Sequence, residues 1–146
     1  MFTATAFRVS SNTDPVVNAL IRRQTDRRLR RIAAAGRGAI QQRLRELDEE
    51  WDIERAIECN ASALAFTGVA LAVTSDNKRW LILPALVTGF LFQHALQGWC
   101  PPVPILRRLG FRTVYEIDEE RQALKALRGD YANVSTPEAA MQAART

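Results

Sequence analysis

The chain has 146 residues, a formal net charge of +4 and a sequence pI of about 9.7, which is enough length for one domain of ordinary size. Its two cysteines, Cys59 and Cys100, are too few for a disulfide framework, and neither has metal-ligand spacing with a histidine or a second cysteine. These facts exclude disulfide-rich secreted modules and zinc-ribbon proteins. Residues 1–15 lack the basic start and apolar stretch of a secretory signal, so we expect any membrane entry to use an internal segment.

The first part of the chain predicts a short arm followed by basic helices. Residues 1–13 are polar, and we expect them to be a mobile arm. An Arg-rich amphipathic helical region is expected over residues 14–58, with Asp14 as N-cap and Pro15 at the first helical position. Gly36 and Gly38 are expected to break this region.

The second helix of this region carries a narrow apolar seam. Ile40, Leu44, Leu47 and Trp51 step by four, three and four residues. This a/d-type spacing lasts less than two heptads, so it favours packing on a partner helix or a membrane surface over a long coiled coil.

The middle of the chain is apolar and predicts a transmembrane hairpin over residues 59–110. Residues 59–75 carry no charge and would measure about 25 Å as a helix. After a turn, residues 80–99 contain no acid, lysine or arginine, which matches a hydrocarbon core of about 30 Å. Trp80 and Trp99 bracket this second segment as interfacial aromatics do.

A soluble bundle with two buried helices is the alternative to a membrane hairpin. Small residues on the first apolar helix favour close packing in lipid; they are Ala61, Ser62, Ala65, Gly68 and Ala72. The charged flanking helices offer few apolar partners for burial. Eleven Lys/Arg precede the first apolar segment, seven follow the second and two lie in the loop between them, so the positive-inside rule predicts both termini in the cytoplasm of a bacterial-type inner membrane.

The C-terminal part, residues 111–146, predicts one amphipathic helix and a tail. Asp118 is the expected N-cap, Lys125 and Arg128 occupy the last turn, and Gly129 is the expected stop. The fold class expected is therefore all-α, a two-helix transmembrane hairpin with flanking cytoplasmic amphipathic helices.

Residues 52–110 resemble the YgaP-type inner-membrane domain, a two-helix family of unknown function. The features that carry the resemblance are Arg55 at the entry to the first helix, Gly68 within it, Trp80 at the start of the second, and the exit sequence Gly98-x-Cys100-Pro101 followed by Leu109-Gly110. The resemblance implies a two-span, oligomeric membrane module. Some members of the family carry a rhodanese sulfurtransferase domain, whereas this chain has an Arg-rich region with no cysteine before Cys59. Sulfurtransferase activity is therefore not carried over.

Three groups of residues are candidates for function. Cys59 and Cys100 are both expected at the cytoplasmic end of the hairpin, where a thiol relay is the functional alternative; no Cys/His dyad is evident in the sequence, and a structural role is favoured. We expect Glu58 or Asn60 to hydrogen-bond His94 or Gln97 across the hairpin, because buried polar groups in lipid need partners. A haem ligand or proton site at His94 is the functional alternative, and the absence of a second histidine disfavours haem.

The arginines form the third group. A surface for lipid or a partner is expected from Arg22, Arg23, Arg27, Arg28, Arg30, Arg31, Arg107 and Arg108. Nucleic acid is disfavoured, because no recognition motif and no aromatic residue accompanies the first six.

Taken together, the sequence predicts a small inner-membrane protein that acts by association, as a homo-oligomer or an accessory subunit of a membrane complex. We expect no catalytic residues, no metal and no cofactor, and membrane lipids and a protein as partners. Two alternatives stay open, a thiol-based sulfur carrier and a soluble helical bundle that binds a partner through its arginines.

Overall fold

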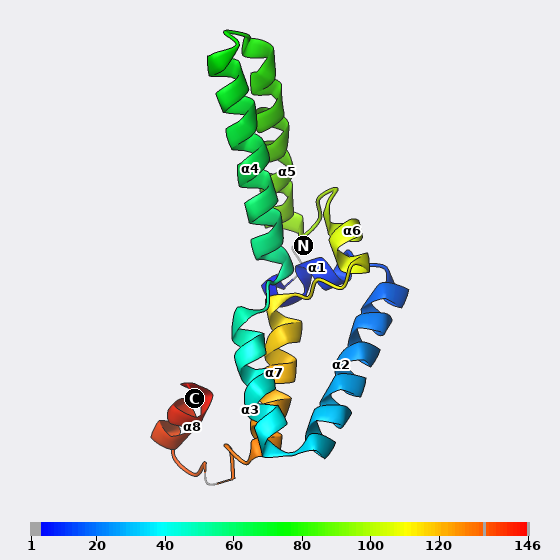
Figure 1. Cartoon of the computed structure of the whole chain (residues 1–146), viewed down its shortest axis with the longest axis vertical. Helices are drawn as coiled ribbons and strands as arrows, with labels where there is room; N and C mark the ends of the chain where they lie inside the picture. Colours follow the sequence, from blue (N-terminus) through cyan, green and yellow to red (C-terminus); the bar gives the residue numbers. More distant parts are fainter. Residues whose placement is uncertain (1–3, 133, 146) are drawn as a thin grey trace. The chain divides into compact units, whose positions relative to one another are not determined.

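The computed structural model describes residues 4–132 and 134–145, and these residues are helical with no strand (Figure 1). The chain divides into two compact units. The first contains the residues up to Ala19 together with Trp51–Tyr115, and the second contains Leu20–Glu50 and the residues from Glu116 onward. The all-α prediction is confirmed, and each unit is described by itself below.

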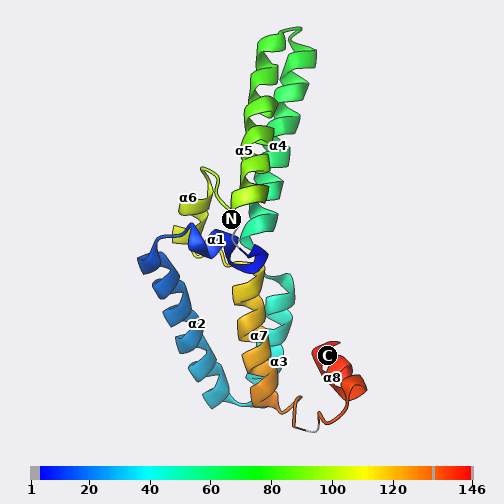
Figure 2. The ribbon, with the colours of Figure 1, turned by 180° about the vertical axis from the view of Figure 1, so that it is seen from behind.

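The first unit is built on two long helices, α4 (Ile53–Thr74) and α5 (Ile82–Gln97). They lie side by side and run in opposite directions in both ribbon views (Figures 1 and 2). The expected turn between them is present: Asp76 has φ of 48°, and the side chain of Asn77 caps η2 (Lys78–Leu81) by accepting a hydrogen bond from the backbone N–H of Arg79. Below, these elements are called the α4–α5 pair.

Close contact within the α4–α5 pair depends on a glycine. A Cβ atom at Gly68 would lie 2.5 Å from Cδ of Pro84, so no larger residue fits without displacing α5. Ala61, Ala65 and Ala72 are also partly buried along α4, whereas Ser62 is exposed. The small residues therefore pack within this chain rather than forming a free surface.

The boundary between the basic region and the first apolar helix lies earlier than the sequence predicts, because α4 begins at Ile53 and not near residue 59. Glu50 adopts an extended conformation and ends α3 (Arg37–Glu49), and the side chain of Asp52 caps α4 by accepting from the backbone N–H of Arg55. The seam residues Ile40, Leu44 and Leu47 are buried, but Trp51 is exposed and lies under the guanidinium of Arg55. The predicted seam thus ends at Leu47.

The N-terminal segment differs from the mobile arm that the sequence indicates. Residues 1–3 lie outside the described residues, but η1 (Thr5–Phe7) and α1 (Arg8–Ser11) are helical. Val9 is buried in a cluster with Ile53, Ile57, Cys100 and Val103. This apolar side chain and the polar groups around it contact α4, α5 and α6 (Val103–Arg108).

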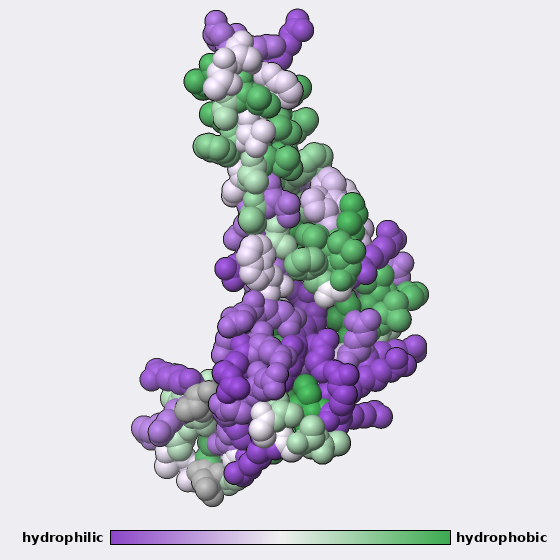
Figure 3. All heavy atoms as spheres, in the orientation of Figure 1, coloured by the Kyte–Doolittle hydropathy of each residue, from purple (hydrophilic) through white to green (hydrophobic). Residues whose placement is uncertain are grey.

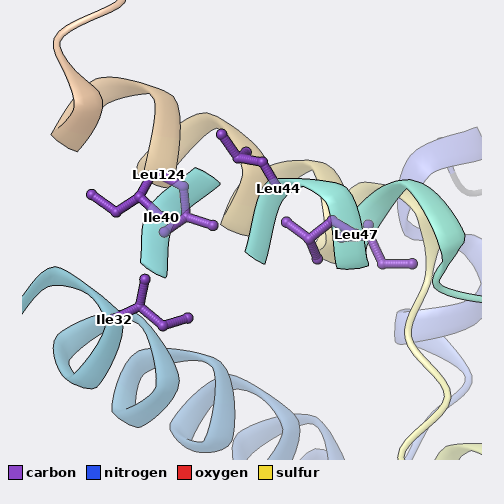
Figure 4. Packing of buried hydrophobic residues seen from close by; sticks show 6 residues of the cluster. Ile32, Ile40, Leu44, Leu47 and Leu124 are labelled. Atoms are coloured by element: carbon purple, nitrogen blue, oxygen red, sulfur yellow. The ribbon is translucent and has the colours of Figure 1, made fainter. Parts of the chain in front are cut away.

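The second unit is a small helical cluster made by α2 (Pro15–Ala35), α3 and α7 (Val114–Arg128), with the first residues of α2 and α7 belonging to the first unit. Gly36, with φ of 89°, ends α2 as expected, and Gly129 follows α7. The core consists of Ile32, Ile40, Leu44, Leu47, Ile117 and Leu124 (Figure 4). The apolar seam of α3 is therefore buried against helices of the same chain.

Two C-terminal boundaries also differ from prediction. The helix α7 begins at Val114, four residues before the expected N-cap Asp118. Beyond it, the expected tail contains α8 (Pro137–Arg145), whose first turn includes Glu138. Thr136 accepts a hydrogen bond from the backbone N–H of Ala139, so a side-chain cap accounts for this start.

Candidate functional site

A network of polar side chains lies where α4 begins and α5 ends. Nε2 of His94 on α5 lies 2.6 Å from Oε2 of Glu54 on α4. The other carboxylate oxygen of Glu54 accepts a hydrogen bond of 3.0 Å from Arg8 of α1. His94 is only 3% exposed, so its ring depends on these protein partners. Below, the term His94 site means these three side chains, Arg8, Glu54 and His94, together with Cys100, which is described next.

The tautomer of His94 follows from its partner. A carboxylate paired with arginine is an acceptor, so Nε2 of His94 donates and carries the proton. Nδ1 is buried and has no hydrogen-bond partner among the described residues. The ring therefore has one nitrogen oriented by Glu54 and one buried nitrogen without a hydrogen bond.

Cys100 is the group that lies beside this ring. Gly98 ends α5 in the left-handed conformation with φ of 73°, which turns the chain back toward the helix. Cys100 is 2% exposed, packs with Ile53 and Ile57 on either side of Glu54 in the sequence, and interacts with the His94 ring. Cys100 and His94, which are six positions apart in the sequence, are thus neighbours in the structure. The sequence alone did not reveal this.

Gly98 also holds the N-terminal segment against the site. A Cβ atom at Gly98 would lie 2.5 Å from the backbone carbonyl of Arg8, closer than real contacts allow. Nδ2 of Asn12 donates to the backbone oxygen of Gln97 at 2.7 Å. These contacts place α1 over the end of α5 and position Arg8 on Glu54.

The structure changes the partner assigned to His94. The contacting carboxylate belongs to Glu54, one helical turn before the expected Glu58, which is exposed. Asn60 donates to the backbone oxygen of Ala56 within its own helix, and Gln97 contributes its backbone to Asn12 rather than its side chain to α4.

The two thiols occupy different surroundings. Cys59 is exposed on α4, whereas Cys100 is buried in the His94 site. Cys100 also lines an apolar pocket of about 190 Å³ formed with residues of α4, α5 and Pro101. Only Cys100 therefore combines a neighbouring histidine with an adjacent cavity.

The arginines predicted as a surface fall into two classes. Arg22, Arg23, Arg27, Arg30, Arg31 and Arg108 are exposed. Arg107 is 1% exposed and donates to Oδ1 of Asn18 and to the backbone oxygen of Phe111, so its assignment to a lipid-facing surface is wrong. Arg28 is partly buried and pairs with Glu120 at 3.1 Å.

Glu120 is the centre of an ion-pair group in the second unit. Its side chain is fully buried, and it accepts hydrogen bonds from Arg28 and from Arg43, whose Nε lies 3.0 Å away. Burial disfavours the charged form of Arg43, but hydrogen bonds to Glu120 and charges nearby more than offset it, so the pKa of Arg43 lies above its ordinary value. Arg28, one of the arginines predicted to form a surface, therefore takes part in an ion pair within the second unit.

No family model, curated protein or solved structure matches the chain. The resemblance to the YgaP-type domain stays a prediction, and no residue role is taken from it. Function must accordingly be argued from the chain's own geometry.

The apolar segments are the remaining feature that bears on function. Within the described residues, one segment ending at Thr74 and one formed by Lys78–Gln97 are long and apolar enough to cross a membrane. Each segment contains an apolar stretch of 18 residues, and only 22% of the first stretch and 6% of the second are buried in the chain. Most of the apolar surface therefore faces outward. Figure 3 shows this hydrophobic surface over the α4–α5 pair, with hydrophilic residues at its turn.

Proposed function

We propose that the protein is a small integral membrane protein, anchored by the α4–α5 pair, that acts by association with membrane lipids and with a protein partner. The observation that carries this proposal is the outward-facing apolar surface of the pair. The exposed side chains include Phe66, Val73, Ile82 and Phe92, each at least 66% exposed. Water would disfavour this surface, whereas a hydrocarbon core would not.

The burial pattern argues against the soluble-bundle alternative. A core helix of a soluble protein is mostly buried, but only 22% and 6% of the two apolar stretches are buried in this chain. Many large apolar side chains are left on the outside. This arrangement suits lipid as the surrounding solvent.

The orientation proposed places both termini in the cytoplasm of a bacterial-type inner membrane. Lys78 and Arg79 are the two basic residues of the loop, whereas seventeen lie outside the pair and one, Arg55, lies in the first turn of α4. The exposed arginines of α2 then supply positive charge on the cytoplasmic side, where anionic lipid head groups attract it.

Association is the proposed mode of action, with the chain as a homo-oligomer or an accessory subunit. The small-residue stripe is used within the chain, so a partner would meet the outer apolar faces of the pair or the charged helices of the second unit. Alkaline carbonate extraction of membranes from cells producing the full chain tests the anchoring. We expect the chain in the membrane pellet, and its release into the supernatant would contradict the proposal.

Companions are identified by purifying the full chain in mild detergent. Native mass measurement is expected to give either more than one copy or a stable hetero-complex. A monomer without any companion, from membranes that retain the chain in carbonate, would contradict association while leaving anchoring intact.

A further inference from the structure

The short helix α6 carries exposed apolar side chains that lie outside the α4–α5 pair. Among the described residues, every large apolar side chain that is at least 61% exposed belongs to the first unit. Those on the pair are Phe66, Val73, Ile82 and Phe92, and those beyond it are Val16, Ile105 and Leu109. Figure 3 shows hydrophobic atoms gathered over α6 and over the first residues of α2. Anchoring by the pair does not by itself account for this second group.

The two faces of α6 differ in burial and in chemistry. Val103 is fully buried, and Arg107, one turn later, is 1% exposed. On the opposite face, Ile105 is 61% exposed and Leu109 is 71% exposed, with the exposed Arg108 between them at helical spacing. The backbone N–H of Leu109 donates to the backbone oxygen of Ile105 at 3.0 Å, so the helical turn includes Leu109. Ile105, Arg108 and Leu109 are called the α6 face below.

The buried side of α6 keeps the α6 face pointing outward. Nη2 of Arg107 donates to Oδ1 of Asn18 at 2.8 Å, and Nη1 donates to the backbone oxygen of Phe111 at 3.0 Å. Val103 packs in the cluster that contains Ile53 of α4. A rotation of α6 that buried the α6 face would break these hydrogen bonds and expose Val103, and unmade hydrogen bonds of a buried guanidinium are costly. The α6 face is therefore fixed toward whatever surrounds the chain.

The connection to α5 places α6 at one end of the pair. Residues 98–102 join the two helices, and Cys100 in this connection packs with Ile57 of α4. When the pair spans a membrane, α6 lies at the level of the interface on the side of the termini. An interface offers acyl carbons beside phosphate groups, and the α6 face offers aliphatic side chains beside a guanidinium. The two surfaces are complementary in apolar character and in charge.

We propose that the α6 face is an interfacial membrane contact, with Ile105 and Leu109 among the outer acyl carbons of phospholipids and Arg108 at their phosphates. The inference rests on the anchoring proposed above and adds a contact that sets the depth of the pair in the bilayer. A protein is the less suitable occupant. Two aliphatic side chains and one guanidinium provide much less surface than the about 800 Å² per partner that a stable protein interface buries.

Spin labelling of the full chain in phospholipid nanodiscs gives the test. Ile105→Cys and Leu109→Cys are each made in a Cys59→Ser background, in which the remaining Cys100 is buried. The background chain treated with the same label is the blank, and circular dichroism checks that each labelled chain keeps its helical content. Collisions of the nitroxide with oxygen, which concentrates in lipid, are compared with collisions with nickel–EDDA, which stays in water.

Two further positions calibrate the ratio of oxygen to nickel collisions. Leu86→Cys is the hydrocarbon reference, because Leu86 lies on α5 and is 55% exposed. Glu119→Cys is the aqueous reference, because Glu119 is an exposed acidic position on α7. We expect the ratio at Ile105→Cys and Leu109→Cys to be several-fold above that at Glu119→Cys and below that at Leu86→Cys, since the interface lies between water and hydrocarbon.

The possible results separate this inference from the anchoring on which it rests. Ratios at Ile105→Cys and Leu109→Cys equal to that at Glu119→Cys, with a high ratio at Leu86→Cys, would overturn the inference and leave the anchoring intact. A low ratio at Leu86→Cys would overturn the anchoring and the inference with it. Protection of Ile105→Cys and Leu109→Cys from both reagents would show that protein covers the α6 face, which would also overturn the inference.

Two more measurements separate apolar insertion from attraction of charge. High salt should change the ratios at Ile105→Cys and Leu109→Cys by less than about twofold, because salt screens charges but does not weaken apolar contact. A fall of both ratios to that of Glu119→Cys in high salt would overturn insertion. A nitroxide at Arg108→Cys should broaden the phosphorus resonance of the lipid more than one at Glu119→Cys, and equal broadening would contradict the placement of Arg108.

Discussion

Gly68 and Pro84 lie so close that a Cβ atom on the glycine would meet Cδ of the proline ring at 2.5 Å. The same added atom would lie 3.1 Å from Cβ of Leu83 and 3.2 Å from the backbone oxygen of Trp80. Neither the ring nor the backbone can move alone. The approach of α4 to α5 therefore depends on the absence of a side chain at position 68.

Gly68→Ala should consequently destabilise the α4–α5 pair. We expect a loss of about 1–3 kcal/mol in unfolding free energy, which is the range for overpacking a close contact. Detergent-solubilised protein titrated with sodium dodecyl sulfate and followed by circular dichroism provides the measurement. The matched control is Gly89→Ala, because a Cβ atom at Gly89 would meet nothing within 4 Å. Equal losses in the two variants would show that helix packing is not the cause.

The contacts of Glu54 predict a second effect on stability. Glu54→Gln weakens the charge-assisted hydrogen bonds to His94 and Arg8, and we expect a loss of about 1.5–3 kcal/mol. Glu58→Gln, one turn later and exposed, should change stability by less than about 0.5 kcal/mol. Thermal unfolding of both variants in one detergent compares them. A larger loss for Glu58→Gln would restore the partner that the sequence had indicated.

Glu120 predicts an effect on stability in the second unit. Glu120→Gln removes the carboxylate that Arg28 and Nε of Arg43 share, while Arg43 keeps its ion pairs with Glu46 and Glu50, so we expect a loss of about 1–3 kcal/mol. Glu119→Gln, on the exposed side of the same helix, should stay near the stability of the unchanged chain. Urea unfolding of the full chain in detergent measures both. Similar midpoints for the two variants would contradict a structural role for Glu120.

The exposed arginines of α2 predict that the rate at which trypsin cleaves α2 depends on the charge of the surrounding lipid. In nanodiscs of anionic lipid at low salt, trypsin should cleave α2 several-fold more slowly than in zwitterionic nanodiscs, because each charge near the surface contributes about 1 kcal/mol. High salt should remove this protection. Cleavage at Arg145 is the internal reference for trypsin activity, and the arginines followed are Arg22, Arg23, Arg27, Arg30 and Arg31. Identical relative rates in both lipids would favour a protein partner over lipid.

Several elements could be predicted from the sequence because their cause is local. The break at Gly36 follows from a residue that tolerates positive φ, and the turn after Thr74 follows from Asp76 and Asn77. The buried face of α3 follows from the spacing of Ile40, Leu44 and Leu47. Each of these signals lies within a few residues of the structure that it causes.

The features that could not be predicted depend on contacts between distant residues. The sequence indicates an exposed basic residue beside a span at Arg107, yet the residue is buried and its Nη2 donates to Asn18, 89 positions away. The choice of Glu54 over Glu58 depends on the offset between α4 and α5, which the length of the turn sets. The pairing of Cys100 with His94 requires the left-handed turn at Gly98. Periodicity carries none of this information.

The contacts of α1 have a consequence for the order of assembly. Arg8 meets Glu54 across 46 positions, and Asn12 meets Gln97 across 85 positions. During synthesis these N-terminal residues leave the ribosome well before their partners exist, and closing such long loops is slow. α1 therefore docks only after α5 has been made, so completion of the His94 site is a late event in the biogenesis of the chain.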